Sequence, residues 1–240
     1  MRSFFHLITM KIILSKNISD IFEKATQIPT ISVAPFEDLD APVNMHPDML
    51  FFVIDKTVFC YNKYYLNNES LFDKIKKEGY DIVRVKKECK REYPNDISLN
   101  VLKMGKTLFG KKTHVAPEIL KYAEKNGYSF INVNQGYASC ATLVLNDDNA
   151  ITADVSLKKA IENVGKKALL ISGGGISLPG YNCGFTGGAS VVIDKNVYFF
   201  GDVNFLQDYE IIDEKITSLN MKTFSITTGG VYDFGGAKLI

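Results

Sequence analysis

The chain has 240 residues and a formal net charge of +1, with 46% hydrophobic and 23% charged residues, as expected for a packed globular protein. No apolar run approaches the roughly 18 residues that a membrane-spanning helix needs, and no basic stripe indicates a nucleic-acid surface. The four cysteines are scattered without a CxxC pair, which favours reduced thiols in a cytoplasmic protein over a disulfide framework.

The N-terminal stretch MRSFFHLITMKIILS (1–15) is apolar, but it is not typical of a signal peptide. It lacks a small-residue cleavage site and is interrupted by Lys11. Met1 and Met10 are both candidate starts. The strand KIILS precedes a helix that begins at Ser19 or Asp20, and TISVAP (30–35) forms a second strand. This order predicts a folding unit that lacks its first strand.

Four later segments repeat one pattern of two apolar strands joined by a tight polar turn. They are FFVIDKTVF (51–59), LNVLKMGKTLF (99–109), TLVLNDDNAIT (142–152) and SVVIDKNVYF (190–199). The last apolar residues before the turns lie 48, 43 and 48 residues apart. A period in this range predicts a repeat array or propeller.

Each of these hairpins is followed by a predicted helix and a third strand, which defines a ββαβ unit. Helices are expected near 69–78, from Pro117 to Gly127, over 156–167 and within 205–219, from helical spacing of apolar residues and from early Pro or closing Gly and Asn residues. The predicted units span approximately 49–88, 95–134, 141–173 and 189–228.

The C-terminal segment FGGAKLI (234–240) supplies a first strand with no unit after it. Pairing it beside residues 11–15 completes a fifth unit, split between 229–240 and 10–35. Closing the ring in this way leaves no open sheet edge. We therefore predict one α/β domain over residues 1–240, a closed five-unit β/α propeller, with an irregular α/β domain as the alternative.

The segments that lead into the first strands should face a common centre, so their polar residues are candidates for a site. His46 and Asp48 lie two residues apart, and in an extended segment they would share a face. Cys140 precedes a core strand, and a cysteine with a distant histidine fits nucleophilic catalysis. A small core cysteine and a structural histidine are the alternatives. The three scattered histidines make a zinc site unfavourable.

These motifs and the five-unit pattern resemble the guanidine-modifying enzymes, or penteins, which include arginine deiminases, agmatine deiminases, dimethylarginine hydrolases and amidinotransferases. His46-Pro47-Asp48 matches the H-x-D motif of that group, and Cys140 matches its nucleophile two units later. The resemblance implies a hydrolase or transferase for a C–N bond of a guanidine-like or amidine-like small molecule, without a metal or cofactor. Cys140 would attack the central carbon, His46 would serve as acid and base, and Asp48 would hold the substrate nitrogens.

The chain departs from the pentein pattern at two positions where the group usually carries acids. Thr228 stands before Gly229-Gly230, and Thr186 stands before Gly187-Gly188. Asp233 is a candidate substitute for substrate binding, with a plain turn residue as the alternative. Cys183, in a Gly-rich segment, is a further candidate. Because a guanidinium loses charge-assisted hydrogen bonds without these acids, a catalytically inactive binding protein on the same scaffold is the alternative function.

Overall fold

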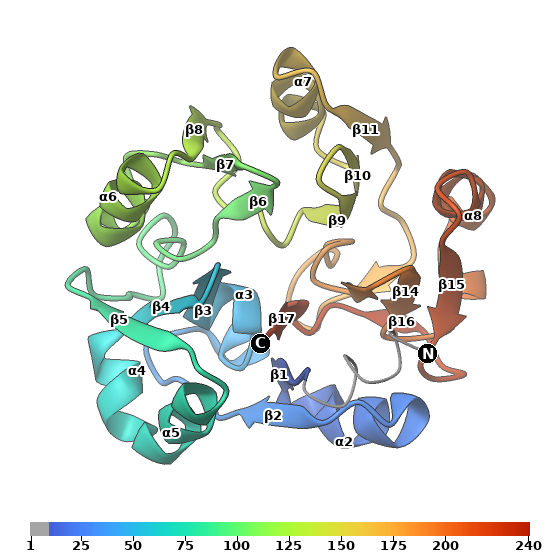
Figure 1. Cartoon of the computed structure of the whole chain (residues 1–240). Helices are drawn as coiled ribbons and strands as arrows, with labels where there is room; N and C mark the ends of the chain where they lie inside the picture. Colours follow the sequence, from blue (N-terminus) through green and yellow to red (C-terminus); the bar gives the residue numbers. More distant parts are fainter. Residues whose placement is uncertain (1–9) are drawn as a thin grey trace.

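The strands and helices form a ring of five units around a central axis (Figure 1). This computed structural model describes residues 10–240, so the predicted absence of a signal peptide concerns a stretch that lies mostly outside the described residues. In each unit the first strand pairs antiparallel with the second, and the second pairs parallel with the third. The five-unit propeller predicted from the repeat is confirmed.

The strands group into five three-stranded sheets and one two-stranded sheet. The three-stranded sheets contain β17 (Ala237–Leu239), β1 (Ile12–Ser15) and β2 (Thr30–Val33); β3 (Phe51–Ile54), β4 (Thr57–Tyr61) and β5 (Asp81–Val85); β6 (Leu102–Met104), β7 (Thr107–Gly110) and β8 (Ser129–Asn132); β9 (Thr142–Asn146), β10 (Asn149–Thr152) and β11 (Lys167–Leu170); and β13 (Ser190–Ile193), β14 (Asn196–Phe199) and β15 (Lys222–Ser225). The small sheet pairs β12 (Ile176–Ser177) with β16 (Val231–Tyr232).

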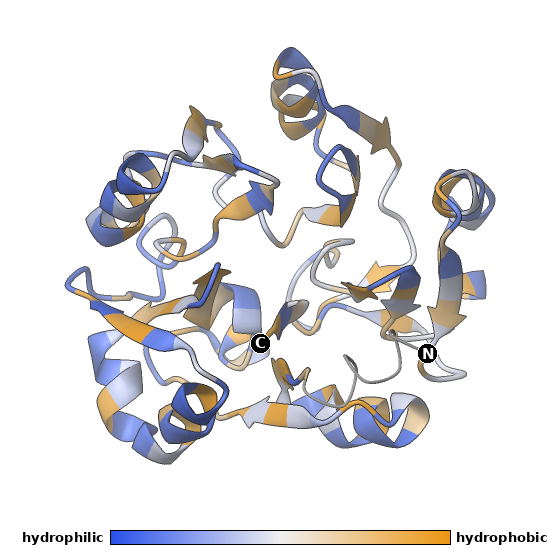
Figure 2. Ribbon diagram, in the orientation of Figure 1, coloured by the Kyte–Doolittle hydropathy of each residue, from blue (hydrophilic) through white to orange (hydrophobic). Residues whose placement is uncertain are grey.

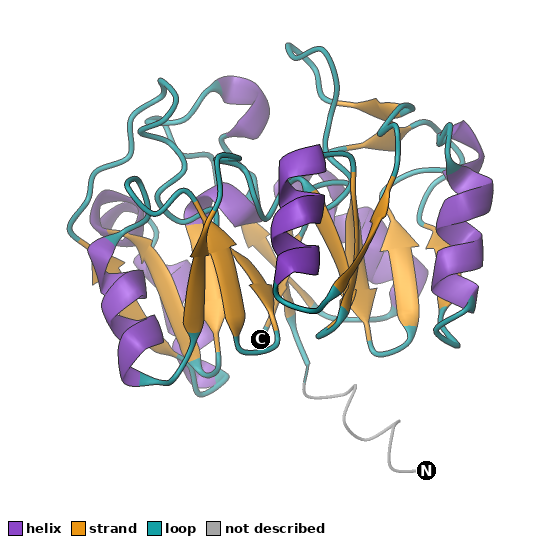
Figure 3. Ribbon diagram, turned by 90° about the horizontal axis from the view of Figure 1, so that it is seen from above, coloured by secondary structure: helices purple, strands orange, loops and turns teal. Residues whose placement is uncertain are grey.

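The helices between the second and third strands of the units lie on the outside of the ring, whereas α3 precedes the first strand of its unit and lies near the centre (Figures 1 and 3). The α-helices are α2 (Lys16–Thr26), α3 (Pro47–Leu50), α4 (Asn62–Asn67), α5 (Glu69–Lys77), α6 (Pro117–Lys125), α7 (Val155–Asn163) and α8 (Tyr209–Thr217), and the 3₁₀ turns are η1 (Ala41–Val43) and η2 (Val203–Phe205). None of these elements within residues 10–240 combines the length and apolar character that a membrane span requires.

Two predicted helices differ in detail from the structure. The helix expected within 205–219 begins at Tyr209, because Asp202 accepts a hydrogen bond from the Asn204 amide at 3.0 Å and closes a separate 3₁₀ turn before it. The helix of the first unit is accompanied by a second one, α4, which ends at Asn67. Asn68 is non-helical (φ −138°) and separates the two.

The hairpin turns explain why the repeat is visible in the sequence. Asp55 and Asp194 follow the first strands of their units with positive φ values of 50° and 54°, and Gly105 takes the same role with φ 58°. Aspartate tolerates this left-handed conformation and glycine adopts it without a Cβ penalty. Each turn therefore reverses the chain in two residues and leaves apolar strands on both sides.

The ring closes where β17 pairs with β1 in antiparallel register, Ile12 opposite Leu239. The seam extends one residue further, because the Lys11 amide donates to the Ile240 carbonyl at 2.8 Å and the Ile240 amide donates back at 2.9 Å. The prediction that residues 237–240 lie beside residues 11–15 is confirmed. This pairing covers the edge that β1 would otherwise expose.

The hydrophobic core lies between the sheets and the outer helices. Each helix buries one face: α2 buries Ile18 and Phe22, and α5 buries Phe72 and Ile75. Figure 2 shows hydrophilic and hydrophobic stretches alternating along the peripheral helices, as helices packed on one side require. The first strands of the units, in turn, surround the axis of the ring.

Candidate active site

Two cavities lie on the axis of the ring. The first, of about 330 Å³, is lined by residues from the first strands of all five units, such as Val53, Lys103, Val144, Val192 and Lys238. The second, of about 250 Å³, is lined by the segments that lead into those strands and by the loop before β13: Val43, His46, Met49, Tyr137, Cys140, Leu178, Tyr181, Asn182, Cys183, Phe185 and Asp233. We call these the strand cavity and the loop cavity.

His46 and Asp48 enter different cavities. His46 is extended (φ −77°, ψ 116°) and stands immediately before α3, whose first residue is Pro47. The proline ring presets a helical φ, so the segment turns at this point rather than continuing as a strand. His46 consequently lines the loop cavity, whereas Asp48 lines the strand cavity. The prediction of one extended segment with both side chains on a shared face is wrong.

A buried asparagine, Asn100, contacts both Cys140 and the backbone of Asp48. The Asn100 amide nitrogen lies 2.9 Å from the Cys140 sulfur and 3.2 Å from the Asp48 carbonyl, and the Asn100 side-chain oxygen accepts the Ser139 amide proton at 2.8 Å. Asn100 is fully buried and Cys140 is 3% exposed. One side chain thus fixes the loops of three segments around the thiol.

The electrostatic surroundings keep the thiol protonated in the unliganded protein. Burial raises the pKa of Cys140 well above its usual value, and the nearby Asp48 and Asp233 carboxylates raise it further. Burial also raises the pKa of Asp48 to about 6, against the opposing charge of Lys238. Lys238 is half-buried on β17, and burial lowers its own pKa. A bound cation would reverse these penalties, because it stabilises both carboxylate and thiolate.

Asp233 and His46 lie next to each other in the wall of the loop cavity. The Asp233 carboxylate accepts hydrogen bonds from the Phe185 and Gly235 amides, each at 2.9 Å, and lies 3.7 Å from Nδ1 of His46. Burial raises the pKa of Asp233 to about 7, with a further contribution from Asp48. Burial lowers the pKa of His46 to about 4, although a hydrogen bond to the Asp233 backbone opposes this shift. The imidazole is therefore neutral at pH 7 and can accept a proton.

The remaining predicted site residues divide into three placements. Cys183 is exposed and lines the loop cavity together with Cys140. Thr186 is buried and lines an adjoining cavity of about 140 Å³, with no hydrogen-bond partner for its hydroxyl among the described residues. Thr228 is exposed and does not line the loop cavity. The structure brings Cys183 to the cluster, places Thr186 beside it, and leaves Thr228 outside.

Asn100 and Lys238 belong to the cluster but were not predicted from the sequence. Asn100 stands two residues before β6, as Cys140 stands two residues before β9. Comparing equivalent positions of the units would have found it. Lys238 lies within β17, and only its register against β1 turns the side chain toward the strand cavity, which no local pattern indicates.

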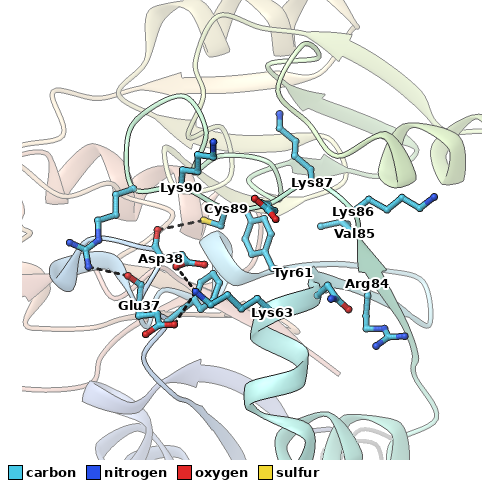
Figure 4. A pocket seen from close by; sticks show the side chains of 14 residues that line it. Glu37, Asp38, Tyr61, Lys63, Arg84, Val85, Lys86, Lys87, Cys89 and Lys90 are labelled. Carbon is cyan, nitrogen blue, oxygen red and sulfur yellow. Dashed lines mark hydrogen bonds and ion pairs between the residues drawn. The ribbon is translucent and has the colours of Figure 1, made fainter.

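A third and larger cavity, of about 830 Å³, lies away from this cluster between β4, β5 and the loops that follow β2 and β5 (Figure 4). Two of its acids are paired, because Lys63 contacts Glu37 at 2.9 Å and Asp38 at 2.8 Å, whereas Arg91 donates only to the Glu37 backbone carbonyl at 3.0 Å. Its thiol, Cys89, has a pKa raised by burial to about 12. No histidine is among the residues that line this cavity, so it offers less acid–base chemistry at its thiol than the loop cavity does. Within residues 10–240, no group of three or more His, Cys, Asp or Glu side chains is arranged to hold a metal ion.

Solved structures with this architecture include guanidine-modifying enzymes. A dimethylarginine dimethylaminohydrolase adduct with S-methyl-L-thiocitrulline aligns with a TM-score of 0.59 at 12% identity, over 96% of this chain and 99% of that chain. The enzyme of Pseudomonas aeruginosa, complexed with citrulline, gives 0.56 at 12% identity over 92% and 95%. The N-terminal domain of the cyanobacterial arginine dihydrolase ArgZ, bound to product, gives 0.55 at 12% identity over 95% and 94%. The fold is thus the pentein propeller, as the resemblance in sequence implied.

Sequence comparison identifies a family but no individual curated protein. A family model described as "Family of unknown function (DUF6873)" matches residues 12–237. No curated protein matches the sequence.

Proposed function

Because the chain belongs to the family of unknown function DUF6873, we propose its function from the site itself: a hydrolase or transferase that acts on a C–N bond of a guanidine-like or amidine-like small molecule. One observation carries the proposal. The buried thiol of Cys140 shares a cavity with the neutral imidazole of His46. Two buried carboxylates, Asp48 and Asp233, raise the pKa of this thiol. Without a ligand, burial disfavours the charged forms of the thiol and of both carboxylates, and a bound cation stabilises them.

The reaction begins when the substrate cation enters the loop cavity. Its charge favours ionisation of Asp233, which lines this cavity and holds the nitrogen atoms, and of Asp48, whose carboxylate acts on Cys140 from the strand cavity. The Cys140 thiol transfers its proton to His46, and the sulfur forms a bond to the central carbon while the C=N electron pair moves to nitrogen. The tetrahedral adduct then expels an amine, which takes the proton from the imidazolium. This leaves an amidino group bound to sulfur.

Turnover requires a second nucleophile. Water, or an amine in a transferase, attacks the carbon of the sulfur-bound group while neutral His46 accepts its proton. Collapse of this second adduct breaks the S–C bond and returns the Cys140 thiolate. The thiolate then takes the proton back from the His46 imidazolium. Asn100, through its contact with the sulfur, orients the nucleophile in both halves. The fold shared with dimethylarginine dimethylaminohydrolase and arginine dihydrolase supports this class of reaction.

A catalytically inactive binding protein is the second candidate. Its support is the chemistry of the unliganded site, where burial and two carboxylates oppose thiolate formation at Cys140. In that case the two acids would bind a cationic ligand without covalent chemistry. Reactivity of the thiol toward a cationic reagent separates the two candidates.

We expect chloroacetamidine, a cation, to alkylate Cys140 faster than neutral chloroacetamide, and the ratio of the two rates to rise from pH 5 to pH 8. The pKa values of Asp48 and Asp233 are raised to about 6 and about 7, so both carboxylates gain charge over this interval and attract the cation. Ionisation of the thiol itself cancels in the ratio. Mass-spectrometric mapping in a Cys183→Ser background, which removes the exposed thiol, provides the measurement. A ratio near one across this range would contradict cation binding by these carboxylates, and failure of both reagents to label Cys140 would favour the binding protein.

We also expect Asp48→Asn to stabilise the fold at pH 8 by an amount on the order of 2 kcal/mol. Burial disfavours the charged form of Asp48 and raises its pKa from 3.8 to about 6, and one carboxylate oxygen has no hydrogen-bond partner among the described residues. A raised pKa means that the protonated carboxyl stabilises the fold at low pH and that this stability is lost as pH rises through about 6. The difference between variant and native protein should therefore vanish near pH 4.

Urea unfolding at pH 4 and pH 8 measures this effect. Asp20→Asn, at an exposed position on α2, is the matched control and should leave the free energy of unfolding unchanged at both values. Destabilisation by Asp48→Asn at pH 8 would show that the ionised carboxylate is compensated in the folded protein.

A further inference from the structure

The loop cavity has an apolar wall and no basic residue. Six of its lining side chains are aliphatic, thioether or aromatic: Val43, Met49, Leu178, Tyr137, Tyr181 and Phe185. The only ionisable partners among the lining residues, besides the tyrosines and cysteines, are His46 and Asp233, and none of them is lysine or arginine. The nearest cation of the cluster, Lys238, lines the strand cavity beside Asp48 instead.

The hydroxyl groups of the two tyrosines donate hydrogen bonds to acids that are not among the lining residues of the cavity. The Tyr137 hydroxyl donates to the Asp96 carboxylate at 2.6 Å, and the Tyr181 hydroxyl donates to Asp40 at 3.4 Å. Asp96 is 4% exposed, and its other oxygen has no hydrogen-bond partner among the described residues. The hydroxyl protons are therefore not available to an anionic ligand, and negative charge stands behind both rings.

The rings also supply a surface for an apolar group. Tyr137 and Phe185 lie with their centroids 6.1 Å apart and tilted by 35°, so that they present adjoining faces. A volume of about 250 Å³ accommodates an amidinium group with a short alkyl or aryl substituent. Ligand pockets of this kind gain affinity from apolar lining and take their orientation from a few polar groups.

From these observations we infer that the site takes a guanidine or amidine with an apolar substituent and without a carboxylate. This inference rests on the proposed function for its amidinium group, which Asp233 holds in the loop cavity. The substituent lies against Tyr137, Phe185 and Leu178. A carboxylate held against these side chains would lose water without gaining a cationic partner, and the Asp96 carboxylate lies behind Tyr137, so its binding is unfavourable.

The test compares two chloroacetamidines of equal length, one carrying N-pentyl and the other N-(4-carboxybutyl). At pH 8 we expect the pentyl reagent to alkylate Cys140 faster by about tenfold or more, since the unpaired buried carboxylate costs at least that much. Equal rates, or a faster carboxylated reagent, would overturn the inference.

A variant that adds a positive charge to the cavity sharpens the comparison. Asn182 is exposed and lines the loop cavity, so Asn182→Arg places a cation beside the substituent and should shift the rate ratio toward the carboxylated reagent. Thr228→Arg adds the same charge at an exposed position outside the cavity and should leave the ratio unchanged. An equal shift in both variants would indicate long-range attraction rather than selection by the cavity wall, and would count against the inference.

A separate measurement distinguishes failure of this inference from failure of the proposed chemistry. If unsubstituted chloroacetamidine does not label Cys140 faster than chloroacetamide, the proposed function fails. Calorimetric binding of pentylguanidine and of 5-guanidinopentanoate to the unmodified protein then tests the cavity alone. Tighter binding of pentylguanidine supports the apolar substrate class, whereas equal or tighter binding of the acid contradicts it.

Discussion

His46→Ala should slow alkylation of Cys140 by chloroacetamidine by about a hundredfold, the usual scale of a positioned proton acceptor. His46 is neutral at pH 7 because burial lowers its pKa to about 4, and it shares the loop cavity with Cys140. Without this imidazole, the thiol proton has only carboxylates to move to, and these are needed in their charged form by the cation.

Two internal comparisons control this experiment. The exposed Cys183 lines the same cavity, and its rate of modification by chloroacetamide should not depend on His46. His114→Ala, at an imidazole that lines neither axial cavity, should leave Cys140 labelling unchanged. An undiminished rate in His46→Ala would remove His46 from the mechanism.

Deletion of residues 237–240 should abolish cooperative folding or lower Tm by about 10 °C or more. The deletion removes β17 and with it all the hydrogen bonds that cover the outer edge of β1. Residues Ile12, Ile13 and Leu14 of β1 are fully buried, so the loss exposes apolar surface as well as backbone. A few kcal/mol are a large fraction of the stability of an ordinary domain.

Thermal unfolding followed by circular dichroism measures the consequence. Lys238→Ala keeps the strand and removes only a half-buried amine, so it separates the role of the backbone seam from that of the side chain. A deletion variant that melts at the temperature of the native protein would mean that the ring does not depend on its closing sheet.

The repeat could be read from the sequence because each unit carries its own local signals. Asp55 and Asp194 mark two of the tight turns with a residue that tolerates positive φ, and continuous apolar runs flank them. The closure of the fifth unit was predicted correctly because the N-terminal segment lacks a first strand and the C-terminal segment supplies one. Elements set by local chemistry were thus predictable, whereas their side-chain directions were not.

The site shows where local reasoning stops. Thr228 before Gly229-Gly230 was matched to one of the usual pentein acids, but β16 stands between Gly229-Gly230 and β17. The pair that leads into the first strand of the fifth unit is Gly235-Gly236, and the acid near it is Asp233. The match therefore fell on Thr228, which is exposed, whereas the buried carboxylate, Asp233, lies five residues further along the chain. A proline at the start of a short helix caused the comparable error at Asp48.

The seam between β17 and β1 also bears on how the ring forms. The strands of each complete unit lie close in sequence, as in the sheet from Phe51 to Val85, whereas the seam pairs Ile12 with Leu239, more than 220 residues away. Bringing such distant segments together costs loop-closure entropy before any contact repays it. We expect the four contiguous units to assemble first and the seam to close after the rate-limiting barrier. Contacts made after the barrier govern the rate of unfolding, so the seam sets the lifetime of the folded ring rather than the speed of its formation.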